Sequence, residues 1–462
     1  MLRQYPLSIE ITQIVSNYAS SLRFNELDSS TLHAVGLFLI DYVASVYAGY
    51  RVNSQFNSAL NLVLQGEITS SGKSTIYFCD VKAPSASAAF LNAAYAHGAD
   101  IDDGNKGAMG HIGAHLISAL GSLAEESCCS FKTFVESVVV GYDIFCRLGS
   151  AVQPGLVNRG YHSTGMVGAI ACAAASAKLL GLRSDGIYHS IAIAASQASG
   201  LLLVGETGQE TKPLNAARAA QIGVFSAKLA ANGVVGPACP LESNKGWCHE
   251  VSDLVDEHAI LDGLGKRFSI NECYLKKYPS CRHTHCAIEA AEQIRKKAPS
   301  KEITGVSIWT YGHAIELAGQ IDMPRSSSEA KFSIKYAVAT VLNKGTFGFQ
   351  ALEVGSVNSE VIKLISRIDL LQDDTLERIS EGVRGARVSV RFRDGSELLE
   401  EVLIPKGDPE NPFNDGDILR KLSDCASWKY DSHDLRARSQ GLFDRVNCLL
   451  KMPDVEFSFL DM

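Results

Sequence analysis

The sequence lacks an excess of positive charge and a long uninterrupted apolar run. Its 462 residues carry a net charge of −8, and no segment gathers basic residues. We therefore expect no nucleic acid partner, because binding to phosphates requires a basic surface. The longest apolar stretch, 34–48, contains Asp41 and is too short to span a membrane. It predicts a buried helix, and no membrane partner is expected.

An export signal and a disulfide framework are also missing from the sequence. Residues 1–10 contain no apolar segment of the signal-peptide kind, and the 12 cysteines follow no regular spacing. A cytoplasmic location with reduced thiols is the simplest explanation. The balance of 46% hydrophobic and 20% charged residues is typical of a globular protein, and the length predicts two domains.

What the sequence has in quantity is helical periodicity, from the N-terminus to residue 267. One of the expected helices, over 164–180, is dominated by Gly and Ala and has no polar face, so it should be buried on all sides. Residues 1–267 are therefore predicted to form a large all-helical domain. The expected helices begin near Ser29, Ser85, Ile112, Phe131 and Thr164.

The pattern changes after residue 267. Alternating apolar residues predict strands over 305–311 and 387–404, and Asp394–Gly395 predicts a hairpin turn within the second of these segments. Together with expected helices, these strands predict a smaller α+β domain over 268–409. Residues 410–462 turn helical again and are expected to return to the first domain. The predicted fold is thus mainly α with an α+β part. The helices expected in the smaller domain cover 286–296, 330–342 and 359–368.

One segment between two expected helices, residues 97–115, concentrates groups that do chemistry. It holds three Asp, three His and one Lys among five Gly. Gly contributes no core contacts, so this loop is expected where the backbone approaches another group closely or adopts unusual dihedral angles. A solvated, Asp-rich helix terminus is the alternative. The first catalytic candidates are Asp100, Asp102, Asp103 and His111.

Four further segments place polar groups in apolar surroundings. One of them opens the Gly/Ala-rich helix, where free backbone N–H groups favour an anion. Another carries a basic group at a helix start with Pro in its first position, and carboxylates are its natural ligand. The segments are 159–165 with Arg159 and His162, 211–218 with Thr211 and Lys212, 278–285 with Arg282 and His285, and 324–331 with Arg325 and Lys331.

In order and composition, these segments resemble the MmgE/PrpD family, which includes 2-methylcitrate dehydratase, cis-aconitate decarboxylase and iminodisuccinate epimerase. The resemblance runs along nearly the whole chain. It implies a homodimer in which the α+β domain covers the helical domain as a lid, with no metal and no cofactor. The matching segments are 97–111, 141–149, 159–165, 212–223, 229–237, 278–285 and 329–333.

Carried over position by position, the resemblance also implies a set of pocket residues. This sequence departs from the pattern of the dehydratases and decarboxylases. Those enzymes commonly have Thr where this sequence has Gly104, and Pro where it has Ile112. These departures look more like the branch around iminodisuccinate epimerase. Asn215 replaces a His that the family often has at that position. The implied catalytic residues are Asp100, His111, His162, Lys212 and His285.

The chemistry common to these enzymes is removal of a proton next to a carboxylate. Its transition state gains negative charge, so the site requires a base of near-neutral pKa and fixed positive charge. His111 or His285 would exchange the proton, and Asp100 would orient the histidine. We therefore predict a cofactor-free acid/base lyase, of the dehydratase or decarboxylase type, for a small di- or tricarboxylate. The substrate-binding groups are expected to be Lys212, Arg282, the helix N-terminus at His162, Asp103, Arg159 and Thr211.

Other functions remain open on the residues alone. An isomerase or epimerase of a dicarboxylate would use the same base, and a non-catalytic scaffold would explain the departures at Gly104 and Ile112. Cys281 could act as a nucleophile, although Cys is usually a small buried hydrophobe. Metal sites are conceivable at His111 and His115 with Asp102 and Asp103, or at Cys281, His283 and His285.

We expect no metal at either of these places. The first pair of histidines lacks the Glu of a zinc protease, and the second set would diverge on a helix. His283 is expected to be a packed histidine.

Overall fold

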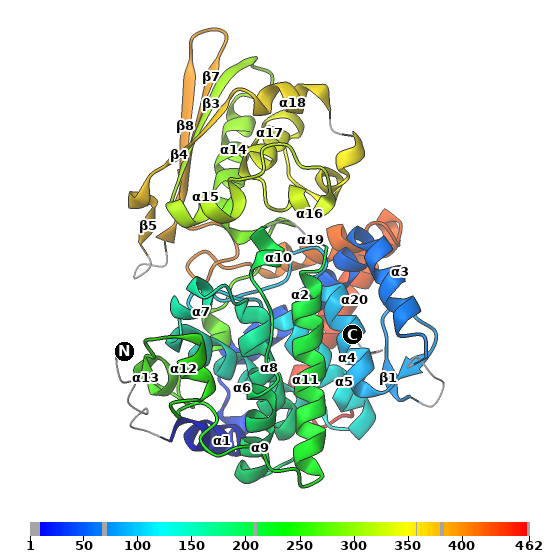
Figure 1. Cartoon of the computed structure of the whole chain (residues 1–462). Coiled ribbons are helices and arrows are strands. Elements are labelled where there is room, and N and C mark those ends of the chain that lie inside the picture. The colour runs from blue at the N-terminus through cyan, green and yellow to red at the C-terminus, as the bar shows by residue number, and fades with distance from the viewer. Residues whose placement is uncertain (1–9, 67–71, 207–209, 357, 379–382, 460–462) are drawn as a thin grey trace.

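The computed structural model describes residues 10–66, 72–206, 210–356, 358–378 and 383–459. A large helical unit carries a smaller α+β unit at one end (Figure 1), so the predicted fold class is confirmed. Residues 1–9, on which the expectation about an export signal depends, lie outside the described residues.

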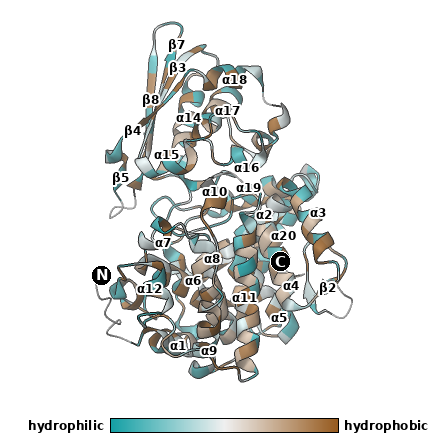
Figure 2. Ribbon diagram, in the orientation of Figure 1, coloured by the Kyte–Doolittle hydropathy of each residue, from teal (hydrophilic) through white to brown (hydrophobic). Residues whose placement is uncertain are grey.

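The helical unit is built around α8, in which every residue is buried. Its small residues let α11 and α6 pack closely against it, and a Cβ at Gly223 of α11 would lie only 2.2 Å from Cys172 of α8. The ribbon of α11 carries both hydrophilic and hydrophobic residues in Figure 2, as a covering helix should. The helices of this unit are α1 (Ile11–Ser21), α2 (Ser29–Val52), α3 (Ser54–Val63), α4 (Ser85–His97), α5 (Gly113–Ser127), α6 (Phe131–Ala151), α7 (Gly155–Asn158), α8 (Ser163–Leu179), α9 (Ser184–Ala195), α10 (Leu203–Glu206), α11 (Pro213–Ala231), α12 (Trp247–Val251) and α13 (Glu257–Leu261).

Helix α2 contains the longest apolar stretch of the sequence. It begins after Asp28, whose carboxylate accepts a hydrogen bond from the Thr31 backbone N–H at 2.7 Å. Its 24 residues are long and apolar enough to cross a membrane, but 72% of its most apolar 18-residue stretch is buried inside the protein. Helices α4 and α19 (Asp415–Ala426) pack against it. It is therefore a core helix, as the sequence predicts.

The α+β unit is a four-stranded sheet in the order β4-β3-β7-β8, with α14 packed on β7 and β8. Strand β3 pairs in parallel with β4 and antiparallel with β7, and the hairpin from β7 to β8 turns at Gly395, where φ is +83°. The main elements are α14 (His285–Lys297), β3 (Ile303–Thr310), α15 (Gly312–Ala318), α16 (Ser327–Ala330), α17 (Ile334–Lys344), α18 (Ser359–Ile365), β4 (Ile368–Gln372), β7 (Ala386–Phe392) and β8 (Glu397–Val402), with a two-stranded pair of β5 (Glu377–Arg378) and β6 (Val383–Arg384). A second two-stranded pair, β1 (Ser74–Thr75) with β2 (Lys82–Ala83), belongs to the helical unit and contacts α4.

Two expected helices of this unit are wrong in their bounds. The one expected over 330–342 begins later, as α17 at Ile334, because the Ser333 hydroxyl accepts the Tyr336 N–H at 3.1 Å and starts the helix there. The one expected over 359–368 ends at Ile365. Ile368 instead begins β4, opposite Val306 of β3, so strand pairing takes the end of the expected helix.

The two units have separate hydrophobic cores. One core draws its buried residues from 11–275 and 413–459, and the other from 278–402. Helix α19 (Asp415–Ala426) packs on α2, and α20 (Ser432–Lys451) packs on both. Polar contacts join the units, including Lys331 Nζ to the Gly98 carbonyl oxygen at 2.9 Å and Arg51 to the Glu353 carboxylate at 3.3 Å. Residues 97–115 lie at this junction.

Candidate active site

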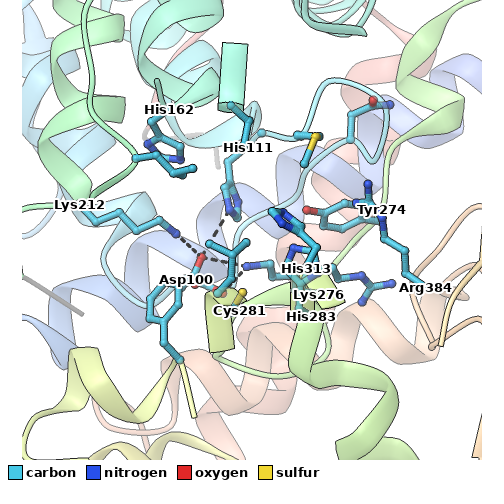
Figure 3. A pocket seen from close by; sticks show the side chains of 18 residues that line it. Asp100, His111, His162, Lys212, Tyr274, Lys276, Cys281, His283, His313 and Arg384 are labelled. Atoms are coloured by element: carbon cyan, nitrogen blue, oxygen red, sulfur yellow. Dashed lines mark hydrogen bonds and ion pairs between the residues drawn. The ribbon is translucent and has the colours of Figure 1, made fainter. Parts of the chain in front are cut away.

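A small cavity of about 100 Å³ lies at the junction of the two units (Figure 3). Its walls come from the loop that follows α4, the starts of α8 and α11, the segment before α14, and α15. Enclosed cavities with converging polar groups are the usual sites for small molecules. Polar side chains supply much of the lining: Asp100, Asn105, His111, His162, Lys212, Tyr274, Lys276, Arg282, His283, His313 and Arg384.

Asp100 joins the two units at the floor of the cavity. Its Oδ1 lies 2.9 Å from Lys212 Nζ and 2.9 Å from Lys276 Nζ, and Lys276 also donates to the Asp100 carbonyl oxygen. Burial by itself would raise the pKa of Asp100, but the two ammonium groups outweigh it and hold that pKa well below its usual range. Asp100 is therefore a fixed negative charge that positions two lysines.

The glycines of residues 97–115 let neighbouring side chains approach the backbone closely. A Cβ at Gly104 would lie 2.5 Å from the Tyr274 hydroxyl, and one at Gly110 would lie 2.8 Å from the Phe145 ring. The unusual dihedral angles belong to other residues, Asp100 with φ +54° and Met109 with φ +51°. Left-handed backbone is costly for residues with a Cβ. The loop thus holds Asp100 in a strained conformation that the contacts to Lys212 and Lys276 stabilise.

His111 presents an unprotonated nitrogen to the cavity in its neutral form. Its Nδ1 lies 2.9 Å from the Asp103 carbonyl oxygen and 3.3 Å from Asp102 Oδ2. Both of these oxygens are acceptors, so Nδ1 carries the proton and Nε2 is left with its lone pair. Nε2 lies 3.5 Å from Asp100 Oδ1, so a proton taken up at Nε2 would face a carboxylate. This is the arrangement that a general base requires.

His162 is the N-cap residue of α8 and lines the same cavity. Its Nδ1 lies 2.9 Å from the Asn215 side-chain nitrogen. Burial first, and then the positive charge of Lys212, lower the pKa of His162 well below its usual value, so the ring is neutral near pH 7. His162 is therefore an uncharged polar group beside the basic ones.

The α+β unit supplies further cations. Arg282 lines the cavity and donates to Asp408, and its guanidinium also donates to His285 Nδ1 at 2.9 Å. Arg384 lines the cavity as well and lies 3.7 Å from Glu377. Among the described residues of the lining, Asp100 is the one carboxylate. The cations outnumber it, so the cavity suits an anion.

Of the candidates from the sequence, the structure brings Asp100, His111, His162, Lys212 and Arg282 to the cavity wall. His285 does not reach it, since its side chain is completely buried behind Arg282 and its Nε2 lies 3.4 Å from the Ser280 carbonyl oxygen. Burial, followed by the charge of Arg282, lowers the pKa of His285 well below its usual value. In this structure His285 is a neutral acceptor that supports Arg282.

Three expected substrate-binding residues also lie away from the cavity. Asp103 is buried, and its two carboxylate oxygens accept from the Gly113 N–H at 2.7 Å and the Tyr142 hydroxyl at 2.8 Å. Arg159 pairs with Asp253 on the surface at 2.6 Å. Thr211 is exposed and does not line the cavity. Asp103 thus supports the loop, whereas Arg159 and Thr211 lie outside the cavity.

A group of ligand atoms of the kind that holds metals occurs at His97, Asp102 and His111, within 4.8 Å of one another. Hydrogen bonds already use these atoms. Asp102 Oδ2 lies 2.8 Å from His97 Nδ1, and His111 Nδ1 donates a hydrogen bond to the Asp103 carbonyl oxygen. A protonated nitrogen has no lone pair for a metal, so the arrangement as it stands fits a hydrogen-bond network that orients His111 better than a metal site.

Comparison with known proteins decides the family. A model of the MmgE/PrpD N-terminal domain matches residues 13–256, and a model of the MmgE/PrpD C-terminal domain matches residues 278–441. The chain belongs to the MmgE/PrpD family. The resemblance read from its motifs is therefore confirmed.

Several relatives in the MmgE/PrpD family match most of this chain. A cis-aconitate decarboxylase-like protein of Aspergillus oryzae is 26% identical, with 92% of each chain covered. A cis-aconitate decarboxylase of Aspergillus terreus is 24% identical over 96% of this chain and 94% of its own. The human cis-aconitate decarboxylase is 24% identical over 75% of this chain and 74% of its own. Family and relatives together support an enzyme of the dehydratase or decarboxylase type.

The departure from the MmgE/PrpD pattern at Gly104 has a local explanation. Any side chain at this position would collide with Tyr274, whose ring lies against the loop and lines the cavity. Burial raises the pKa of Tyr274 beyond its ordinary value, so its hydroxyl stays protonated. The Tyr274 hydroxyl therefore occupies the space that a side chain at position 104 would need.

The sequence did not single out several residues that line this MmgE/PrpD cavity. Lys276 was not among the candidates from the sequence, and His283 was expected to be packed away. The structure shows that His283 does pack, donating to or accepting from the Tyr311 hydroxyl, and that it lines the cavity as well. No local pattern marks His313 or Arg384.

His115 takes no part in the site and makes a testable contribution to stability. It is completely buried, and neither ring nitrogen has a hydrogen-bond partner among the described residues. Burial is the main cause that lowers its pKa to about 3. Because the unfolded value is near 6.5, the unfolded chain binds this proton more tightly, and stability present above pH 6.5 is lost as the pH falls.

We expect His115→Leu to reduce this acid sensitivity. One such group removes up to about 1.4 kcal/mol of unfolding free energy per pH unit below its unfolded pKa. Urea unfolding at about pH 7.5 and about pH 5 should therefore show a difference smaller by about 2 kcal/mol in the variant. His258→Leu, at an exposed histidine, is the control. An unchanged pH dependence in His115→Leu would contradict the prediction.

Proposed function

We propose that this protein is a cofactor-free lyase that acts on a small di- or tricarboxylate by general acid/base proton transfer. One observation supports it above the others. A small cavity at the junction of two units places a histidine with a free Nε2 beside Lys212, Lys276, Arg282 and Arg384. A base next to several fixed cations is what proton removal beside a carboxylate requires.

The cations would bind the substrate by its carboxylates. Lys212 comes from the helical unit and Arg282 and Arg384 come from the α+β unit, so a substrate with two or three carboxylates would contact both units. Burial would lower the pKa of Lys212, but the Asp100 carboxylate more than compensates and raises it. Lys212 therefore stays charged, and its positive charge is available both for binding and for the transition state.

The reaction would begin at the carbon next to a bound carboxylate. His111 Nε2 takes the proton from this carbon, and the electron pair of the broken C–H bond moves into the adjacent carboxylate. Lys212 and Lys276 lie at the floor of the cavity to stabilise the added negative charge. The electron pair then returns to form a C=C bond, the C–O bond to the hydroxyl on the next carbon breaks, and the protonated His111 gives its proton to the departing oxygen, so that water leaves. In a decarboxylation no C–H bond breaks first: the C–C bond to one carboxylate breaks, CO2 leaves, the electron pair moves toward a second, conjugated carboxylate, and a protonated histidine then delivers a proton to carbon.

The relatives suggest which substrates to test first. Two of them, from Aspergillus terreus and human, are named cis-aconitate decarboxylase. Tricarboxylates of the aconitate type are therefore tested first, followed by citrate-like and amino-dicarboxylate compounds. Their identity to this chain is 24%, so the panel has to cover all three chemical classes.

The deciding experiment is proton NMR of this panel in D2O. We expect one class of carboxylate to take up deuterium at the carbon next to a carboxylate, together with release of water or CO2. Activity should survive prolonged treatment with EDTA, because His97 Nδ1, Asp102 Oδ2 and His111 Nδ1 already take part in hydrogen bonds. Exchange with inversion but no release would favour the isomerase alternative. Loss of activity that one added metal restores would contradict the cofactor-free mechanism.

A further inference from the structure

Asn215 lies one turn after Lys212 at the start of α11 and contacts His162. Its side-chain nitrogen is 2.9 Å from His162 Nδ1 and 3.3 Å from the Leu201 carbonyl oxygen. A carbonyl oxygen only accepts hydrogen bonds, so the amide NH2 group has to face it. The second N–H of the same group then points at His162. His162 Nδ1 must therefore be the acceptor.

We propose that Asn215 holds His162 in the tautomer with its proton on Nε2, which makes His162 the neutral hydrogen-bond donor of the cavity. A neutral imidazole has a single N–H, and using Nδ1 as an acceptor places that N–H on Nε2. Asn215 is thus a positioning residue that acts through His162. The chemical consequence rests on the proposed function, whereas the tautomer is a property of the free protein.

The charge state of His162 makes the tautomer matter. Burial and the nearby Lys212 ammonium keep the ring neutral near pH 7. A neutral ring presents either an N–H or a lone pair at Nε2, and the partner at Nδ1 selects between them. With Asn215 at Nδ1, the cavity receives an N–H. With a carboxylate at position 215, it would receive a lone pair.

His111 has the opposite tautomer to His162. Its Nδ1 donates to the Asp103 carbonyl oxygen, so its Nε2 has a lone pair. One cavity thus contains two histidines with opposite protonation at Nε2, one to take a proton and one to donate a hydrogen bond. His97 lies near both, with its ring centroid 4.7 Å from that of His111 and 6.2 Å from that of His162.

This pairing assigns distinct roles during proton removal. The substrate C–H bond breaks, an N–H bond forms at His111 Nε2, and the electron pair moves onto a carboxylate oxygen. The His162 N–H hydrogen-bonds to that oxygen, and no covalent bond of His162 breaks. A donor aimed at developing negative charge typically contributes about 10²- to 10³-fold to kcat. A lone pair in its place would repel the same oxygen.

The test is Asn215→Asp, which replaces the amide donor by an acceptor of nearly the same shape. We expect it to move the proton of His162 to Nδ1 and to lower kcat roughly 10²-fold with little change in KM. The control is Asn232→Asp, the same chemical change at the end of α11, where the exposed Asn232 side chain donates a hydrogen bond to the Lys228 carbonyl oxygen. It should leave both the His162 tautomer and the kinetics unchanged.

The tautomer is read by ¹⁵N NMR of histidine-labelled protein, with the His162 signals assigned by their loss in His162→Gln. The free wild-type protein should show Nε2 protonated and Nδ1 unprotonated, and Asn215→Asp the reverse. A wild-type His162 protonated on Nδ1 would overturn the proposal, even if Asn215→Asp does not fold. The reading needs no turnover, so failure of the proposed reaction would appear separately, as an absence of product with the tautomer intact.

Discussion

His111→Gln should lower kcat by roughly 10²-fold or more and abolish exchange of the substrate's α-proton with D2O. The reason is that His111 Nε2 faces the cavity with a free lone pair, because the proton of the neutral ring is on Nδ1, which donates a hydrogen bond to the Asp103 carbonyl oxygen. Gln keeps hydrogen-bonding groups in this place but does not accept a proton near neutral pH. Proton NMR in D2O and steady-state kinetics measure both effects on one preparation.

The control for this substitution is His258→Gln, at an exposed histidine of α13 away from the cavity, which should behave like the wild type. Thermal unfolding of His111→Gln checks that the fold is retained. If a folded His111→Gln kept near wild-type exchange, another group would be the base. Exchange retained without turnover would instead assign His111 to a later step.

Lys212→Met should raise KM and lower kcat together, with a loss on the order of 3 kcal/mol, or about 10²-fold, in kcat/KM. Lys212 is expected to bind a substrate carboxylate and to stabilise the transition state, so both parameters depend on its charge. The change also leaves the buried Asp100 carboxylate with Lys276 as its remaining ammonium partner. Steady-state kinetics with the substrate found in the exchange panel measures the loss.

Lys363→Met provides the matched control, because Lys363 is exposed on α18 and pairs with Glu360 there. Breaking a buried ion pair also destabilises a protein, by about 3–5 kcal/mol in typical cases. Lys212→Arg separates the two effects, since it keeps the charge beside Asp100. Unchanged kinetics in a folded Lys212→Met would remove Lys212 from the site.

The helical elements were predictable because their signals are local. The spacing of apolar residues located α4, α5, α6 and α8 to within a few residues, and the small residues of α8 correctly indicated burial on all sides. Strand β4 was missed because its formation depends on pairing with β3, more than 60 residues earlier in the chain. A short apolar segment next to a helix does not show this by its spacing.

The site was predictable where a motif marked it and not where the chain folds back. Asp100 and His111 belong to one loop of unusual composition, whereas Lys276 reaches Asp100 across 176 positions of sequence. Arg282 and His285 stand three residues apart on one face of a helical turn, with one in front of the other. The sequence could not show that Arg282 faces the cavity and that His285 lies behind it.

The separate cores of the two units have a consequence for how such an enzyme can change its substrate. The proposed base and its orienting groups belong to the segment with the first core, whereas Arg282, His313 and Arg384 belong to the segment with the second core. Exchanging residues 278–402 between relatives would therefore replace one set of substrate contacts in a single step and leave the proton-transfer groups in place. New specificities can arise in this fold by recombination of gene segments, without rebuilding the chemistry.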